Sequence, residues 1–290
     1  MKKYLLTIFV VFTVLCFGSV LTSCSSPTAK PAVNVAYAAS LENLFEGPIS
    51  KGFLSSTGYD FKGYAGGSSL LANEIVSKDL KADIFISAGT SVNSLVMNKP
   101  IGINYYIVFG TSPLVFAYTA SSKFYQQLKT KPWYDVVTEP GFKVGRTDPI
   151  LDPKGKLTVT LVKKEAQQLN MPSLAGIVET NSNVFPEQDL VGRLESGQLD
   201  GGFFYLSEAV DQHLSYQSMA NLSSGAVYTV GVVNESKNKN GAVAFMNYLL
   251  SSSAQQIFNK NGIKTPTKFT LVGDKSSVPN STLNILNSNK

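Results

Sequence analysis

Two short loops place serine where an apolar segment ends and a helical pattern begins. Ser40 follows the strand-like run Val33–Ala39, and Ser68 follows Gly66-Gly67. Helix N-termini leave amide N–H groups unpaired and carry partial positive charge, so such loops can hold an anion, with the serine hydroxyl as a further donor. Serine is also a common helix N-cap, and either loop taken alone fits that structural role. Two such loops at the same edge of a parallel sheet favour a ligand site.

Three further segments later in the chain carry polar groups at similar junctions. The first is Gly145–Gly155, which contains two Asp-Pro pairs and therefore has a restricted backbone. The second is Val184–Asp189, directly before a helical pattern, and the third is Tyr205, at the end of an apolar strand. Ordinary turn chemistry explains each of them separately.

Common catalytic patterns are missing from the sequence. It contains no dinucleotide-binding glycine pattern, no phosphate-binding loop, no Gly-x-Ser-x-Gly and no His-Glu-x-x-His. Its single histidine, His213, lies in a polar segment where a surface or capping role fits best. The two cysteines, Cys16 and Cys24, lie near the N-terminus, so neither a disulfide framework nor a thiolate metal site is expected in the body. We therefore expect no enzyme and no cofactor.

The elements that must position these loops alternate along the chain. Their pattern predicts βαβ units and a parallel sheet. Strands are expected at 33–39, 59–64, 82–87, 105–119 (interrupted at Gly110 and Pro113), 142–145, 176–180, 201–206 and 226–234. Helices are expected at 41–54, 68–77, 156–169, 190–195 and 241–260, the last closed by Gly262.

The N-terminus has the pattern of an exported lipoprotein. Lys2 and Lys3 precede an apolar run from Tyr4 to Val20, and Leu21-Thr22-Ser23-Cys24 resembles a bacterial lipobox. We expect cleavage before Cys24, a lipid on that cysteine, and a location outside the cytoplasm at the cell membrane; a plain membrane-spanning anchor is the alternative. Residues 1–23 are then a signal peptide and residues 24–32 a Ser/Pro linker.

Composition agrees with a globular body and argues against nucleic acid as a partner. Hydrophobic residues make up 43% of the chain and charged residues 16%, which is ordinary for a folded domain. The net charge of +5 falls to +3 without Lys2 and Lys3, and the only adjacent basic pair in the body is Lys163-Lys164, too little for a basic binding face.

The five loops occur in the order found in one family of transport proteins. The body resembles the substrate-binding proteins of tungstate/molybdate ABC transporters, of the class typified in archaea, over nearly all of its length. The resemblance is carried by Ala39-Ser40-Leu41, Gly67-Ser68, the segment from Trp133 through Asp152-Pro153-Lys154-Gly155, Phe185-Pro186-Glu187, Leu194–Gly197 and Asp200–Tyr205. The 18-residue step from Glu187 to Tyr205 and the Asp-Pro loop are its most specific parts.

The resemblance implies a two-lobed, periplasmic-binding-protein-like α/β fold of type II. Lobe I would comprise 33–113 and 226–290, and lobe II 114–225, with hinge strands near 110–118 and 226–234. It also implies the ligand set. Ser40 and Ser68 from one lobe and Tyr205 from the other would donate hydrogen bonds, together with backbone amides around Pro153 and Lys154.

Asp152 and Glu187 would bind the Mo or W centre itself and expand it from four to six ligands. Carboxylates are poor hosts for a dianion held only by hydrogen bonds, whereas they are suitable hard oxygen ligands for such a metal centre. Sulfur and phosphorus do not readily gain ligands in this way. The implied partners are the oxyanion and the permease and ATPase of an ABC transporter, and we expect a monomer.

Three positions depart from the family pattern. Lys154 stands where the family commonly has Cys, Phe204 replaces an acidic residue, and Gly89 replaces another. These departures leave open the same fold selecting sulfate, phosphate or another small anion. A lipoprotein hydrolase is the rival of a different class, and the missing catalytic patterns argue against it.

Overall fold

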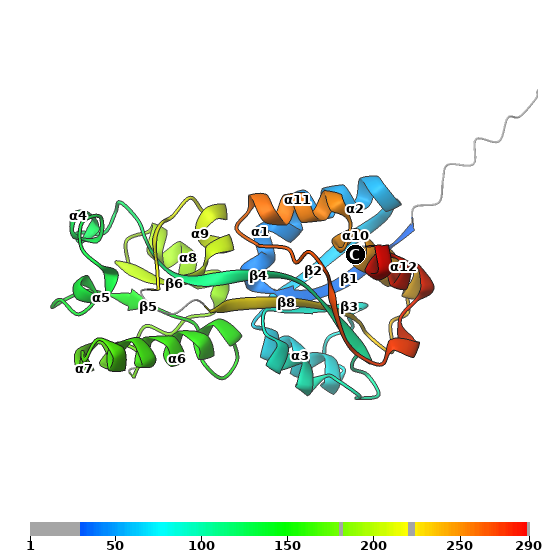
Figure 1. Cartoon of the computed structure of the whole chain (residues 1–290), viewed down its shortest axis with the longest axis horizontal. Helices are drawn as coiled ribbons and strands as arrows, with labels where there is room; N and C mark the ends of the chain where they lie inside the picture. The colour runs from blue at the N-terminus through cyan, green and yellow to red at the C-terminus, as the bar shows by residue number, and fades with distance from the viewer. Residues whose placement is uncertain (1–29, 180–181, 220–223, 289–290) are drawn as a thin grey trace, which may run out of the picture.

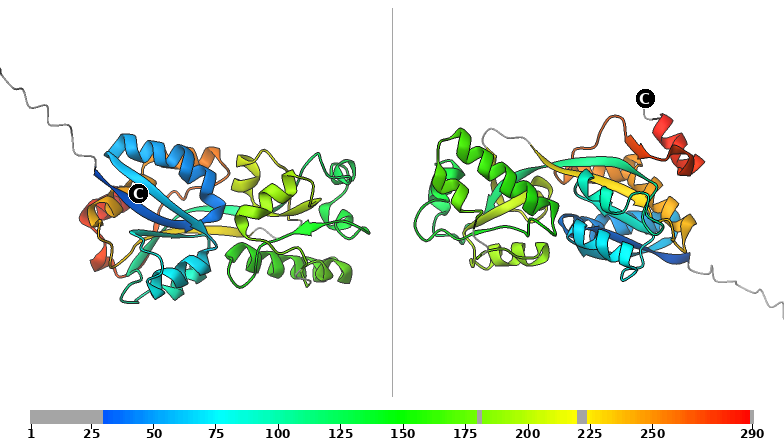
Figure 2. Two further views of the ribbon diagram at one scale, coloured as in Figure 1. Left: turned by 180° about the vertical axis from the view of Figure 1, so that it is seen from behind. Right: turned by 90° about the horizontal axis from the view of Figure 1, so that it is seen from below.

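The computed structural model describes residues 30–179, 182–219 and 224–288, and the expected signal peptide (1–23) and the expected lipid on Cys24 lie outside these ranges. The molecule is elongated and consists of two lobes, as the three views show (Figures 1 and 2). The strands are β1 (Lys30–Ala38), β2 (Tyr59–Gly66), β3 (Ile84–Ser87), β4 (Tyr105–Tyr118), β5 (Val144–Gly145), β6 (Gly201–Tyr205), β7 (Ser215–Ser218), β8 (Gly225–Val232) and β9 (Thr270–Gly273).

Helices flank the sheets on both faces. The α-helices are α1 (Glu42–Leu44), α2 (Ser50–Thr57), α3 (Ser68–Ser77), α4 (Tyr125–Leu128), α5 (Trp133–Val136), α6 (Pro153–Gln168), α7 (Pro172–Gly176), α8 (Glu187–Glu195), α9 (Leu206–Asp211), α10 (Lys239–Leu249), α11 (Ser252–Lys260) and α12 (Asn280–Ser288). The short 3₁₀ segments are η1 (Ala39–Leu41), η3 (Thr90–Leu95) and η4 (Lys275–Ser277), and η2 (Phe45–Ile49) is a π-helical turn. No helix within the described ranges is long and apolar enough to cross a membrane.

The strands are joined in the order β2-β1-β3-β8-β4-β6-β5, with β7 and β9 also paired to β4. The 14-residue strand β4 runs through both lobes. As far as Pro113 it pairs with β8, and from Leu114 onward it pairs with β6. Because β1 pairs in parallel with both β2 and β3, the carboxyl ends of these strands meet at the edge of lobe I that faces lobe II.

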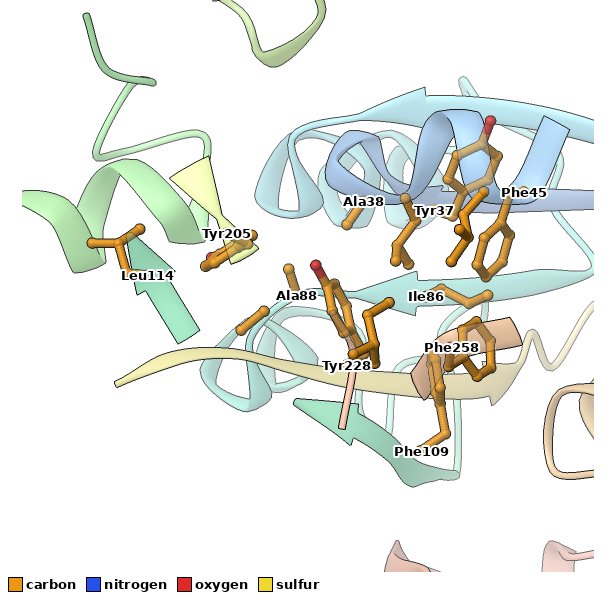
Figure 3. Close-up of a cluster of buried hydrophobic side chains, with 14 of the residues drawn as sticks. Tyr37, Ala38, Phe45, Ile86, Ala88, Phe109, Leu114, Tyr205, Tyr228 and Phe258 are labelled. Atoms are coloured by element: carbon orange, nitrogen blue, oxygen red, sulfur yellow. The ribbon is translucent and has the colours of Figure 1, made fainter. Parts of the chain in front are cut away.

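Alternation along the strands explains how each sheet packs helices on both of its faces. In β1, Val35 and Tyr37 belong to the larger core with Phe45 and Phe245, whereas Ala36 packs on the other face with residues of α3. In lobe II the same alternation places Phe116 against Trp133, with ring centroids 5.2 Å apart. Figure 3 shows part of the larger core, which continues from lobe I to Tyr205 in lobe II.

Several predicted elements differ from the observed ones. The expected strand at 176–180 is wrong, because α7 ends at Gly176 and the chain continues in turns that bury Val178. The helix expected at 241–260 is two helices, because Ser251 caps a new helix at its start. β4 is not interrupted at Gly110 and Pro113; the register only shifts between Val108 and Gly110. The helix expected at 41–54 is distorted at Gly47, next to Pro48.

Candidate functional site

Ser40 lies in η1, directly after β1, at the edge of lobe I that faces lobe II. The hydroxyl of Tyr228, from β8, donates to Ser40 Oγ at 3.2 Å. Since Oγ acts as the acceptor in this bond, the hydroxyl hydrogen of Ser40 remains to donate to an anion. In Figure 3, Tyr228 lies between Tyr205 and the core of lobe I.

Ser68 is the first residue of α3, and Gly67 is its N-cap. Ser68 is buried, and its Oγ accepts the N–H of Ala88, which follows β3, at 3.1 Å. This bond joins the helix start to the end of a neighbouring strand. The first N–H groups of α3 have no partner within the helix, so its N-terminus adds donors and partial positive charge beside the serine.

Asp152 caps the start of α6, the 16-residue helix of lobe II. Its Oδ1 accepts the backbone N–H of Lys154 at 2.7 Å, and Pro153 stands between them at the first helical position, where its lack of an N–H costs no hydrogen bond. The Lys154 N–H that the family resemblance assigns to the anion therefore already donates to Asp152. Burial and the charge of Glu187 raise the pKa of Asp152 well above its usual value.

Glu187 is the first residue of α8 and is 7% exposed. Its Oε1 accepts a bond from Lys154 Nζ at 2.6 Å. Burial raises the pKa of a carboxyl group, but the ammonium of Lys154 and hydrogen bonds at this site outweigh burial and lower the pKa of Glu187 to about 2. The Glu187 carboxylate is therefore ionised at neutral pH, the form that a metal centre binds.

Tyr205 ends β6 and is buried, with 1% of its surface exposed. Its backbone N–H donates to Glu208 Oε2 at 2.7 Å, and its ring meets the ring of Tyr228 edge to face with centroids 6.2 Å apart. Burial, followed by the charge of Asp152, raises the pKa of the Tyr205 phenol well above its usual value, so the hydroxyl keeps its proton and can donate.

Ser40, Asp152 and Glu187 line cavities where the two lobes face each other, whereas Ser68 and Tyr205 are not among the residues that line them. One cavity of about 290 Å³ is lined by Ser40, Glu187 and Glu208. An adjoining cavity of about 320 Å³ is lined by Gly67, Asp152 and Glu187. The helices α3, α6 and α8 all begin beside these cavities, so their partial positive charges and amide donors favour an anion in a site that also contains carboxylates.

Sequence reasoning missed two residues of the site. Glu208 accepts from Tyr205 N–H and from Lys154, and its place three residues after Tyr205, in the first turn of α9, is the spacing of a helix-capping glutamate. Tyr228 reaches Ser40 from a strand that follows it by 188 residues, and nothing local in the sequence indicates that contact.

The raised pKa of Asp152 leads to a prediction for the free protein. Between the ordinary aspartate pKa of about 3.9 and the raised value, the folded protein binds more protons than the unfolded chain, so its free energy of unfolding falls as pH rises. Asp152→Asn keeps an acceptor for the Lys154 N–H but cannot ionise. We expect urea unfolding between pH 5 and pH 8, without ligand, to show a smaller loss of stability in the variant; equal slopes would contradict the assignment.

Comparison with known proteins places the chain in a family. A model of the bacterial extracellular solute-binding proteins matches residues 33–264. The molybdate/tungstate-binding protein WtpA of Thermococcus kodakarensis is 26% identical over 253 residues, covering 69% of this chain and 71% of WtpA, and that of Pyrococcus abyssi is 25% identical over 253 residues, covering 69% and 73%.

Solved structures show the same fold. The periplasmic molybdate-binding protein of Azotobacter vinelandii superposes with a TM-score of 0.64 at 17% identity, covering 81% of this chain and 99% of that one. The sulfate-binding protein SubI of Mycobacterium tuberculosis superposes with a TM-score of 0.62 at 18% identity, covering 81% and 87%. The expected two-lobed fold is confirmed, and the chain belongs to the bacterial extracellular solute-binding protein family.

Proposed function

We propose that this protein captures molybdate or tungstate outside the cytoplasmic membrane and delivers it to the permease of an ABC transporter, without bond chemistry of its own. The names of the relatives from Thermococcus and Pyrococcus support this ligand class. The fold alone does not select it, because a sulfate-binding protein superposes about as well as a molybdate-binding one.

The observation that carries the proposal is the pair of buried carboxylates at the helix starts of lobe II. Asp152 and Glu187 line one cavity together with the N-cap of α3, and both are more than nine-tenths buried. A dianion held only by hydrogen bonds would be repelled by the ionised Glu187. A Mo(VI) or W(VI) centre, in contrast, gains two hard oxygen ligands, while Ser40, Ser68 and Tyr205 donate to its oxo groups.

The walls of the other cavity, the one of about 290 Å³ that Ser40 lines, strengthen this selectivity. Glutamate and aspartate side chains that are at least partly buried line it from both lobes, namely Glu42, Glu187, Glu208 and Asp211. Their charge disfavours every dianion to a similar degree. Only an anion whose central atom accepts a carboxylate regains that cost, so the acidic wall works against sulfate and phosphate.

Capture would proceed by closure of the two lobes. Lobe I would consist of 33–113 together with 226–290, and lobe II of 114–225. Contacts between them support this: Gln188 of α8 donates to the carbonyl of Ala65 at 3.2 Å, and Asn43 donates to Asp211 at 2.8 Å. The connecting strands β4 and β8 are the natural hinges, because β4 is continuous from one lobe to the other.

A lipid on Cys24 would keep this carrier beside its transporter. The basic start, the apolar run and the Leu-Thr-Ser-Cys sequence support that anchor, and residues 25–29, before β1 begins at Lys30, would serve as the tether between lipid and body. In this scheme the protein acts as a monomer whose two lobes together present the closed, loaded form to the permease.

Titration calorimetry with four oxyanions tests the ligand class. We expect the protein, expressed from residue 25, to bind tungstate and molybdate tightly, and sulfate and phosphate weakly or not at all. Tight sulfate or phosphate binding without a response to tungstate or molybdate would instead favour the alternative, in which Asp152 and Glu187 are only turn and capping residues.

A further inference from the structure

Lys154 places a fully buried ammonium group beside the proposed anion site. Its Nζ donates to Glu187 Oε1 at 2.6 Å, and to Glu208 Oε1 at 2.7 Å and Oε2 at 3.0 Å. These contacts engage the three hydrogens of the ammonium group. The lysine side chain is therefore committed to two carboxylates and has no donor left for an oxyanion.

Aromatic rings hold the same ammonium from another side. Lys154 Nζ lies 5.0 Å from the ring centroid of Phe204 and 5.8 Å from that of Tyr205. Lys154 and Phe204, two of the departures from the family pattern, are thus in contact. The third departure, Gly89, lies beside Pro153, the residue before Lys154, since a Cβ on Gly89 would lie 3.2 Å from Pro153 Cβ.

Glu208 is the second carboxylate that holds the ammonium group of Lys154. Its carboxylate also accepts the Tyr205 N–H, so it is fixed to the strand that carries a proposed ligand. Burial lowers the pKa of Lys154, but the charges of Glu187, Glu208 and Asp152 outweigh burial and raise it, so the ammonium stays charged. Lys154 holds Oε1 of Glu187, and Glu187 also forms side-chain hydrogen bonds with Glu208 and Asp152.

We propose that Lys154 is a positioning residue: it fixes Glu187 between α6 and α8 so that this carboxylate can bind the metal centre of the oxyanion, with Glu208 as its anchor. This inference rests on the proposed function and deepens it. A buried charged cluster is not explained by stability alone, because well-packed apolar side chains of similar size are often at least as stabilising. Outer partners of metal-binding groups orient them and commonly change affinity when they are removed.

The test compares two variants that differ in charge balance. Lys154→Met removes the bond to Glu187 and makes the net charge of the cluster of Lys154, Glu187 and Glu208 one unit more negative. Lys154→Met/Glu208→Gln removes the same bond but restores the net charge of the cluster, and the introduced glutamine keeps an acceptor for the Tyr205 N–H. The readouts are tungstate affinity by calorimetry, tungsten coordination by X-ray absorption at the L3 edge, and the thermal melt of the free protein.

We expect both variants to bind tungstate about 10- to 100-fold more weakly than the unsubstituted protein, the range usual for loss of an outer partner. In both, the bound tungsten should keep its short oxo bonds and lose carboxylate oxygen. Unchanged affinity and coordination in the double variant would overturn the proposal and show that Lys154 only balances charge. If Lys154→Met fails to fold, the charge-balanced double variant still decides. Failure of the unsubstituted protein to bind tungstate or molybdate would instead overturn the proposed function, and this inference with it.

Discussion

Replacing Glu187 with glutamine is expected to weaken tungstate binding by about two orders of magnitude or more, equivalent to roughly 2.7 kcal/mol. The amide oxygen is a poor substitute for a carboxylate on a Mo(VI) or W(VI) centre, whereas the change in size is small. The melt of the free protein should move little. The new amide still offers an oxygen to Lys154 Nζ, and Lys154 keeps both oxygens of Glu208, so no buried charge is left without a partner.

Glu195→Gln is the matched control for that substitution. Glu195 lines the same cavity but is exposed, so the change removes the same charge from the mouth of the site without touching a proposed ligand. Solvent screens an exposed charge, and tungstate affinity should change little. Equal losses in the two variants would show that Glu187 acts only through the overall charge of the cleft. A collapse in the stability of free Glu187→Gln would show that the side chain has mainly a structural role.

The sequence predicted some of the element boundaries around the candidate site and missed others. The start of α3 at Ser68 was predicted, because apolar spacing follows the Gly-Gly pair directly. The starts of α6 at Pro153 and of α8 at Glu187 were expected later, at 156 and 190, and it was the family resemblance that selected Asp152 and Glu187. The start of α11 at Ser251 was missed because an apolar stripe continues across it from α10, so periodicity alone could not reveal the interruption.

The chemistry of Lys154 could not be predicted from the sequence. In sequence it is 33 residues from Glu187 and 54 from Glu208, and only the pairing of β5 with β6 and the packing of α6 bring the three together. A lysine two residues into a helix, next to polar loops, would ordinarily be placed at the surface. Its complete burial is a tertiary effect that depends on two acidic partners from separate helices.

Closure of the lobes can be tested by introducing a side chain that keeps the two lobes apart. Gly67, the N-cap of α3, approaches lobe II so closely that a Cβ there would lie 2.7 Å from the carbonyl oxygen of Leu151. Its φ of −60° is open to any residue, so Gly67→Val strains the contact between the lobes and not its own backbone, and free protein that opens at the hinge avoids that strain. We expect tungstate affinity to fall about 100-fold, with the free protein's melt nearly unchanged. Binding depends on closure, and when the closed form is rarely populated, the apparent affinity falls in proportion to the fraction of closed protein.

The matched control for Gly67→Val is Gly176→Val in lobe II, where an added Cβ would have no neighbour within 4 Å and affinity should stay unchanged. X-ray scattering provides the direct readout. Tungstate should reduce the radius of gyration of the unsubstituted protein and of the control, but should reduce that of Gly67→Val much less. If Gly67→Val contracts fully and binds as tightly as the control, the Gly67–Leu151 contact is not part of the loaded form. The carboxylates of lobe II would then have to reach the anion in a more open arrangement of the two lobes.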